Sequence, residues 1–177
     1  LDAWIAPFVM ASINTKVVRR SQALGGHPYG QDFRYEEATL TGKGWGGKIA
    51  AQGLAWGTNL FQSATPDTTL GQVFGWFMPK RGEGPSRSTR EKGFYVIDLW
   101  GTDEAGQIYK CRIKGDRDPG YGSTSKMLAE SAICLSRDET PENYGVLTPS
   151  VAMGEPLLVR LQANAGLTFT WEGIQSQ

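Results

Sequence analysis

The sequence has little of what builds a metal centre, a disulfide scaffold or a membrane span. It contains two cysteines and one histidine, His27, among 177 residues. Two thiols in apolar patterns are too few for a disulfide framework or a four-ligand zinc site, and a single loop histidine does not supply a cluster of metal ligands. No apolar run reaches the ~20 residues that cross a bilayer. Reduced core thiols therefore indicate a cytoplasmic protein without a bound metal.

A net charge of one sign is also missing. Lysine plus arginine and aspartate plus glutamate number 18 each, so no long-range field favours nucleic acid, and we expect no nucleic-acid partner. Apolar residues make up 40% of the chain and charged residues 20%, which is typical of a globular protein. At this length we expect a single domain over residues 1–177. Because the chain opens on Leu1 rather than methionine, we also expect a fragment of a longer protein.

Apolar residues at helical spacing predict several helices. Met10, Ile13, Val17 and Leu24 predict a helix from about Pro7 to Leu24, with the proline in its first turn. A glycine-rich turn, 42–47, is expected before the next one. The other predicted helices are Lys48–Phe61, a short helix capped by Asp67, Ser123–Arg137, and one from Thr148-Pro149 with a kink at Pro156.

Alternating residues predict strands, of which a β-hairpin is the clearest. Its two strands, Phe94–Trp100 and Gln107–Lys114, flank a turn-rich connection, and Asp98 is expected to pair with Lys110 or Arg112. The second strand alternates apolar and basic residues, which is typical of an antiparallel sheet with one open face. Further strands are predicted at Phe33–Leu40 and from Leu167. We therefore predict an α+β fold, in which helices lie mainly on one face of an antiparallel or mixed sheet of at least four strands.

A three-glycine pattern resembles a dinucleotide-binding fingerprint only superficially. Gly42, Gly44 and Gly47 spell G-x-G-x-x-G between a predicted strand and a predicted helix. The preceding strand is polar, whereas a central parallel strand is buried on both faces, and the next predicted element is another helix. Without a βαβ unit, we expect no cofactor-binding site in this chain.

The segment Gly115–Lys126 is the strongest candidate site, because it leads from a strand end through a tight loop into a helix start. Unpaired N–H groups at such a start attract anions, and Arg117 and Lys126 could add charge. In the alternative interpretation, Asp116 and Asp118 pair with Arg117 and cap the turn. The candidates from this segment are Asp116, Arg117, Asp118, Tyr121, Ser123, Thr124 and Lys126.

The middle of the chain is rich in aromatic residues, including Trp45, Trp56, Phe61, Trp76 and Phe77. Core packing explains most of them in one interpretation. In the other, they form an exposed apolar surface for a long-chain lipid, a membrane or a protein partner.

Four longer phrases resemble the saccharopine dehydrogenase-like oxidoreductases, in particular the trans-acting enoyl reductase branch. They reach from near Leu1 to about Phe169 and are Ala6–Met10, Ile13–Ser21, Gly115–Met127 and Gly145–Pro149. In that family an N-terminal Rossmann half binds NAD(P), and a C-terminal half completes the substrate cleft and often dimerises. This chain resembles only the second half.

The resemblance implies that the chain is the C-terminal substrate-binding or dimerisation domain of an NAD(P)-dependent oxidoreductase. The reaction would be hydride reduction of a C=C or C=N bond, with NAD(P) held mainly by the N-terminal Rossmann domain. Expected partners are that domain, a second copy of the chain, and a lipid or acyl substrate. We expect the segment Asp116–Lys126 and the helix bearing Asn14 and Arg19 to face the substrate cleft; the resemblance fixes no catalytic residue. The alternative function is a non-catalytic lipid- or protein-association module, peripheral to a membrane, that uses the aromatic segment.

Overall fold

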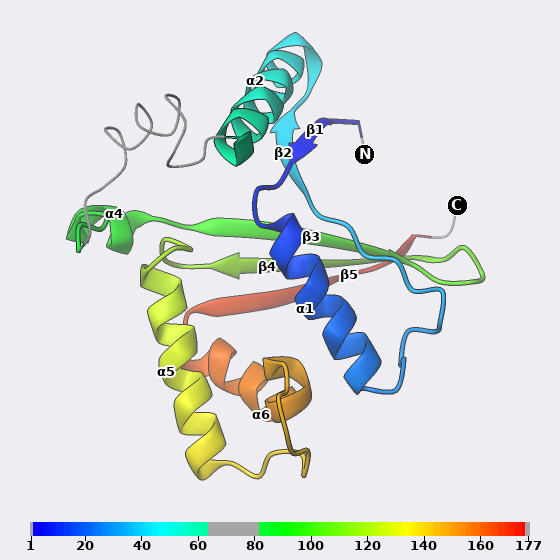
Figure 1. Ribbon diagram of the computed structural model, residues 1–177, viewed down its shortest axis with the longest axis vertical. Helices are drawn as coiled ribbons and strands as arrows, with labels where there is room; N and C mark the ends of the chain where they lie inside the picture. The colour runs from blue at the N-terminus through cyan, green and yellow to red at the C-terminus, as the bar shows by residue number, and fades with distance from the viewer. Residues whose placement is uncertain (1, 64–81, 176–177) are drawn as a thin grey trace. The chain divides into compact units, whose positions relative to one another are not determined.

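The computed structural model describes residues 2–63 and 82–175 (Figure 1). The chain divides into two compact units, Leu1–Glu83 and Gly84–Gln177, and each is described by itself. Together the described residues form five helices and two antiparallel sheets of two and three strands. None of the described helices has the length and hydropathy of a membrane span.

The first unit is built on a two-stranded antiparallel ribbon. Strand β1 (Trp4–Pro7) pairs with β2 (Ala38–Gly42), so that Trp4 lies opposite Gly42 and Pro7 opposite Ala38. Helix α1 (Ala11–Leu24) follows β1, and helix α2 (Gly44–Ser63) follows β2 and packs on the ribbon. Gly47 allows this packing, because a Cβ there would collide with the carbonyl of Gly42.

An irregular connection, residues 25–37, joins α1 to β2. It is fixed by Gln22, which is only 6% exposed. The Gln22 amide donates to the carbonyl of Gly30 at 2.7 Å, and its Oε1 accepts from the N–H of Tyr29 at 3.3 Å. This buried side chain therefore replaces the hydrogen bonds that regular secondary structure would supply to the connection.

The second unit contains a three-stranded sheet and three helices. The strands are β3 (Tyr95–Thr102), β4 (Ile108–Gly115) and β5 (Leu167–Gln175), in the spatial order β3-β4-β5 with all pairings antiparallel. The helices are α4 (Arg87–Lys92), α5 (Gly122–Arg137) and α6 (Pro149–Asn164).

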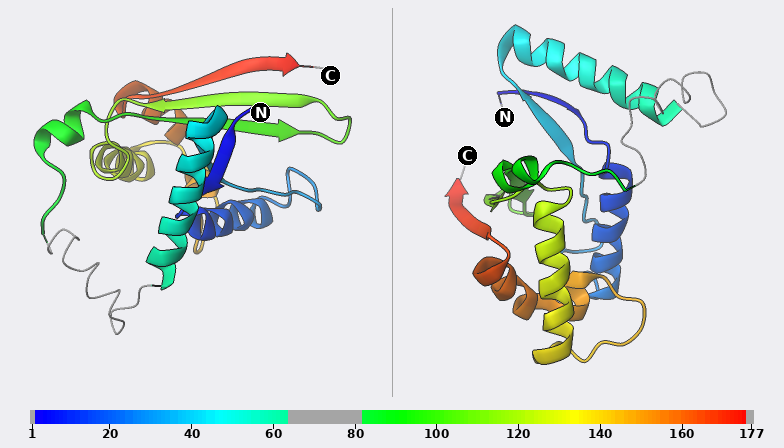
Figure 2. Two further views of the ribbon diagram at one scale, coloured as in Figure 1. Left: turned by 90° about the horizontal axis from the view of Figure 1, so that it is seen from above. Right: turned by 90° about the vertical axis from the view of Figure 1, so that its left-hand side faces the viewer.

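One face of this sheet is apolar and meets the helices, while the other face carries charge. The α5 and α6 helices lie on the same side of the sheet (Figure 2). Their shared core contains Cys134, Met153 and Leu157, all less than 10% exposed. On the opposite face Arg112 donates to Asp98 through Nε at 2.5 Å and through Nη2 at 3.0 Å, which confirms that Asp98 pairs with a basic residue of the neighbouring strand.

The structure confirms the α+β class and the antiparallel pairing, and it corrects several element boundaries. The described strands form sheets of two and three, and no four-stranded sheet occurs among them. The prediction that Pro7 begins a helix is wrong, because Pro7 ends β1 and α1 starts at Ala11. The kink in the last helix is confirmed, with Gly154 at φ 51° and ψ −133° just before Pro156. The short helix expected after Asp67 lies outside the described residues.

Candidate functional site

The N-terminus of α5 is capped by a side chain of the preceding loop. The Asp118 carboxylate accepts the N–H groups of Gly120, Tyr121 and Gly122 at 3.0, 3.1 and 2.6 Å. The hydrogen bond from Gly122 is the main reason that the pKa of Asp118 is lowered. At the start of α5 the N–H of Gly122 is therefore bound by an internal carboxylate, and the N–H of Ser123 by the backbone carbonyl of Asp118 at 2.8 Å, as in the capping alternative.

The other charged candidates form exposed ion pairs, but not the pairing expected from the sequence. Lys126 Nζ lies 3.3 and 3.2 Å from the two carboxylate oxygens of Asp116, and these side chains are 31% and 50% exposed. Arg117 Nη1 lies 4.0 Å from Oε1 of Glu91 on α4. The structure thus pairs Asp116 with Lys126, whereas the sequence suggested Arg117.

The hydroxyl candidates divide into one buried and two exposed residues. Ser123 is fully buried, and its hydroxyl lies 3.0 Å from the hydroxyl of Tyr95 on β3. Thr124 is exposed and donates to the carbonyl of Pro119 at 2.7 Å, while the Tyr121 side chain is 57% exposed. Ser123 therefore anchors α5 to the sheet, and Tyr121 and Thr124 lie at the surface.

Close backbone contacts hold this loop in one position. The N–H of Asp116 donates to the carbonyl of Gly166 at 3.2 Å, and the N–H of Asp118 donates to the carbonyl of Arg90 at 3.2 Å. A Cβ on Gly93 would lie 2.6 Å from Cβ of Asp118, and Gly166, at φ +73°, leaves space for the Asp116 side chain only because it has no Cβ. The exposed groups of the loop are consequently presented on a fixed backbone.

A second polar cluster lies in the first unit, where the sequence indicated only Asn14. The Asn14 amide donates to Oε2 of Glu37 at 2.9 Å, and the Tyr35 hydroxyl donates to Oε1 of the same carboxylate at 2.9 Å. Burial, with a contribution from Glu37, raises the pKa of Tyr35 to about 12. Arg19 is exposed on α1. Asn14 and Arg19 belong to a different compact unit from the α5 loop, and their shared cleft remains a prediction.

Glu37 and Tyr35 were missed by sequence reasoning. The two residues are two positions apart, so in an extended segment both side chains lie on the same side. This spacing was a usable signal that they could interact. Nothing in the sequence indicated that Asn14, 23 residues earlier, would complete the cluster.

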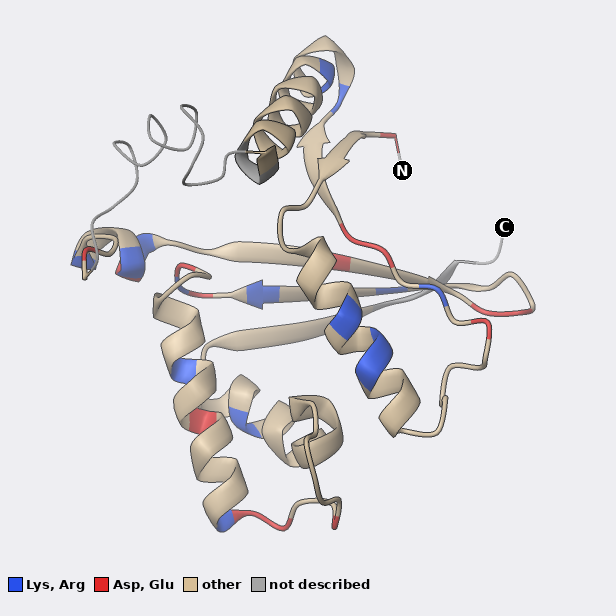
Figure 3. Cartoon of the chain, viewed as in Figure 1, with Lys and Arg blue, Asp and Glu red and all other residues tan. Residues whose placement is uncertain are grey.

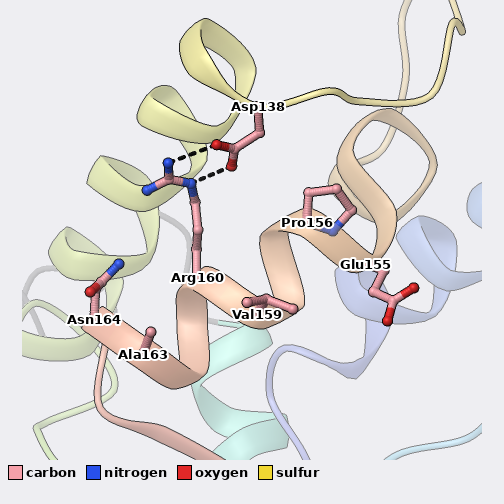
Figure 4. Close-up of a pocket in the computed structure, with 7 residues that line it drawn as sticks. All are labelled: Asp138, Glu155, Pro156, Val159, Arg160, Ala163 and Asn164. Atoms are coloured by element: carbon pink, nitrogen blue, oxygen red, sulfur yellow. Dashed lines mark hydrogen bonds and ion pairs between the residues drawn. The ribbon is translucent and has the colours of Figure 1, made fainter.

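A hollow lies on the second unit, and none of the predicted site residues lines it (Figure 4). It has a volume of about 570 Å³ and is lined by Asp138 at the end of α5 and by Glu155, Pro156, Val159, Arg160, Ala163 and Asn164 of α6. Arg160 donates through Nη2 to Asp138 at 2.8 Å and through Nη1 to Glu130 at 3.1 Å. The pKa of Asp138 is lowered chiefly by its hydrogen bond to Arg160, so this arginine neutralises its neighbours and stabilises the α5–α6 packing.

Neither a metal cluster nor a dinucleotide cradle is found in residues 2–63 and 82–175. No group of three or more histidine, cysteine, aspartate or glutamate side chains there could hold a metal ion. The glycine pattern lies where antiparallel β2 enters α2, with Gly42 and Gly44 at φ 103° and 65°. A Rossmann fingerprint requires a parallel βαβ unit, so these glycines do not fit a nicotinamide dinucleotide.

Comparison with known proteins places the chain near one group of mycobacterial proteins. It is 40% identical over 167 residues to a trans-acting enoyl reductase of Mycobacterium tuberculosis (strain H37Rv), covering 89% of this chain and 39% of that protein. It is 38% identical over 170 residues to a trans-acting enoyl reductase of Mycobacterium leprae, with the same coverage. The chain thus spans about two-fifths of the length of these relatives. No family model and no solved structure matches it.

Proposed function

We propose that this chain, which is homologous to trans-acting enoyl reductases, is the C-terminal substrate-binding part of an NAD(P)-dependent oxidoreductase. The homology over most of the chain carries the proposal. The name of the relatives favours a C=C bond next to an acyl carbonyl as the group that is reduced, and a C=N bond is the alternative.

The homology implies a nicotinamide cofactor in general terms, and two features of this chain argue against its pyrophosphate binding at the places that the sequence suggested. The glycine pattern is in an antiparallel setting, and Asp118 already occupies the start of α5. We therefore propose that NAD(P) is held by an N-terminal Rossmann domain, within the part of the relatives' length that this chain does not cover.

The loop 116–126 is the proposed contribution of this chain to the substrate cleft. Its backbone is fixed by Arg90 and Gly166, while Tyr121 is 57% exposed and the Lys126 side chain, paired with Asp116, is 31% exposed. A pre-positioned cation and phenol suit the carbonyl or thioester end of an acyl substrate, because little reorganisation is needed on binding. Asn14 and Arg19 are proposed to line the same cleft, and a homodimer is proposed as the assembled state.

The reaction is tested with the complete protein and with this chain, both given NADPH and an α,β-unsaturated acyl thioester. We expect the complete protein to consume NADPH only when the thioester is present, and the chain alone to show no turnover. Calorimetry provides a second measurement. Tight, stoichiometric NADPH binding by the chain alone would show that the cofactor site lies in these residues, contrary to the proposal.

Lys126→Ala tests the role of the loop in the complete protein. Its ion pair with Asp116 is partly exposed, and such pairs contribute up to about 1 kcal/mol, so stability should change little. A substrate contact should lower kcat/KM about tenfold or more. Arg87→Ala is the matched control, since Arg87 forms an exposed ion pair with Glu91 at 2.8 Å in the same unit. An unchanged kcat/KM with a large loss of stability would assign Lys126 to the scaffold.

A further inference from the structure

Helix α2 exposes two tryptophans and an isoleucine along one side. The side chains of Trp45, Ile49 and Trp56 are 78%, 65% and 76% exposed, and we call these three residues the tryptophan stripe. At ~100° per residue, Ile49 lies ~40° and Trp56 ~20° around the helix from Trp45. The stripe therefore runs nearly parallel to the helix axis over ~16 Å.

The opposite side of α2 explains why the stripe faces outward. Gly47, Ala51 and Thr58 are buried and follow the same helical spacing on the other side. These small residues let α2 pack closely on the β1–β2 ribbon, where Gly47 meets the backbone of Gly42. The small side chains thus fix the rotation of the helix, and within the described part of the chain the large apolar side chains of the stripe stay mostly exposed.

The charged residues of α2 and of the segment just before it have one sign. Residues 38–63 contain Lys43 and Lys48 and no aspartate or glutamate. In Figure 3 the basic positions of this segment lie near the start of α2. The Lys48 ammonium lies 5.2 Å from the ring centroid of Trp45 and 5.5 Å from that of Trp4. Lys43 contacts Asp2 at 3.3 Å, but both side chains are over 70% exposed, so this pair is weak and screened.

We propose that the tryptophan stripe attaches this protein to the surface of an anionic phospholipid bilayer, with α2 lying in the plane of the interface. Tryptophan prefers the boundary between headgroups and acyl chains, because its ring is apolar and its N–H needs a polar partner. Lys48, beside the rings of Trp45 and Trp4, is placed to meet lipid phosphates. A helix that cannot span a bilayer but presents such a side is suited to lie on it.

A second copy of the chain is a less suitable occupant for this surface. Pairing two stripes would bring two Lys48 ammonium groups into one apolar interface with no acidic residue of α2 to neutralise them. Such burial of unpaired charge is unfavourable. An anionic headgroup layer supplies the missing charge.

Vesicle co-sedimentation of the 177-residue chain tests this attachment. We expect binding to vesicles of phosphatidylcholine with phosphatidylglycerol, and weaker binding to phosphatidylcholine alone. Replacing both Trp45 and Trp56 by alanine should weaken binding about a hundredfold, at about tenfold for each interfacial ring. Lys48→Glu should weaken binding to the anionic vesicles about tenfold, with a smaller effect on neutral ones.

Trp171→Ala is the matched control, because Trp171 is 76% exposed on β5 and lies outside the stripe. It should bind vesicles like the unchanged chain, and circular dichroism should show that all variants are folded. The complete reductase should bind the same vesicles, since the stripe should remain exposed in it. The attachment is overturned if the unchanged chain does not bind, if Trp171→Ala loses as much binding as the double variant, or if the complete reductase does not bind. It is also overturned if the chain does not bind vesicles and light scattering shows a dimer that is lost when Trp45 and Trp56 are replaced by alanine.

Discussion

The contact between Ser123 and Tyr95 allows a scaffold role to be separated from a catalytic one. Ser123 is fully buried at the start of α5, and its hydroxyl lies 3.0 Å from the hydroxyl of Tyr95. Ser123→Ala leaves the tyrosine hydroxyl without this partner, and Tyr95→Phe leaves the serine hydroxyl buried without its own. Each loss of a buried partner costs about 1–3 kcal/mol of unfolding free energy.

The double variant should recover much of this loss. Removing both partners of a hydrogen bond is close to neutral, because no polar group is left unsatisfied. We therefore expect a coupling energy of about 1–2 kcal/mol in a double-mutant cycle measured by urea unfolding of the chain. Additive losses, with a coupling under about 0.5 kcal/mol, would refute the contact.

The same cycle of variants separates the two roles of Ser123 when made in the complete protein, with the proposed reductase activity as the readout. If Ser123 is a scaffold residue, kcat/KM should follow stability and recover in the double variant. If Ser123 contacted the substrate, activity would stay low in both variants that lack it, whatever residue stands at position 95. Only the scaffold outcome agrees with the burial of Ser123.

Two further predictions concern the core and the Tyr35 cluster. Leu157 is 8% exposed in the α5–α6 core, so Leu157→Ala should lower the unfolding free energy by about 2–5 kcal/mol; Leu128→Ala, at a residue 70% exposed, should change it by at most about 0.5 kcal/mol. Equal urea midpoints for the two variants would contradict the packing. Tyr35 has a raised pKa of about 12 against an ordinary 10.0, so its contribution to stability is complete below pH 10.0 and is lost as the pH rises to about 12. The pKa of Tyr35 can be measured from tyrosinate absorbance after subtracting the signal of the Tyr35→Phe variant. In Glu37→Gln this pKa should fall towards its ordinary value, and an unchanged pKa would contradict the contact with Glu37.

Local patterns predicted the second unit well because its elements are set by near neighbours in sequence. The hairpin and α5 agree with the predicted spans within one or two residues, since alternation and a turn-rich connection mark the strands and apolar spacing marks the helix. The kink in α6 was visible in Pro156, although Gly154 takes the unusual dihedral angles. Helix α4 was missed, because its Ser86 cap lies within a basic, glycine-rich stretch that is typical of a loop.

The first unit was predicted less well because distant contacts decide it. Strand β1 has only four residues and exists through pairing with β2, more than 30 residues later. The predicted strand Phe33–Leu40 overlaps β2 only at its end, because residues 33–37 belong to the irregular connection between α1 and β2. In the α5 loop the sequence identified the candidate residues. It did not predict which aspartate caps the helix, Asp118, or that Asp116 pairs with Lys126. Those choices depend on Arg90 and Gly166, which lie far from the loop in sequence.

The two backbone hydrogen bonds donated by Asp116 and Asp118, just before α5, have a consequence for the order in which the second unit folds. The Asp118 amide reaches back to Arg90 and the Asp116 amide reaches forward to Gly166, so both bonds are formed only when segments from both ends of the unit have arrived. Contacts between such distant segments form late, because the chain must first lose loop-closure entropy. The Asp116 and Asp118 amide hydrogens should therefore exchange with solvent only through global opening of the unit, which makes them native-state reporters for hydrogen exchange.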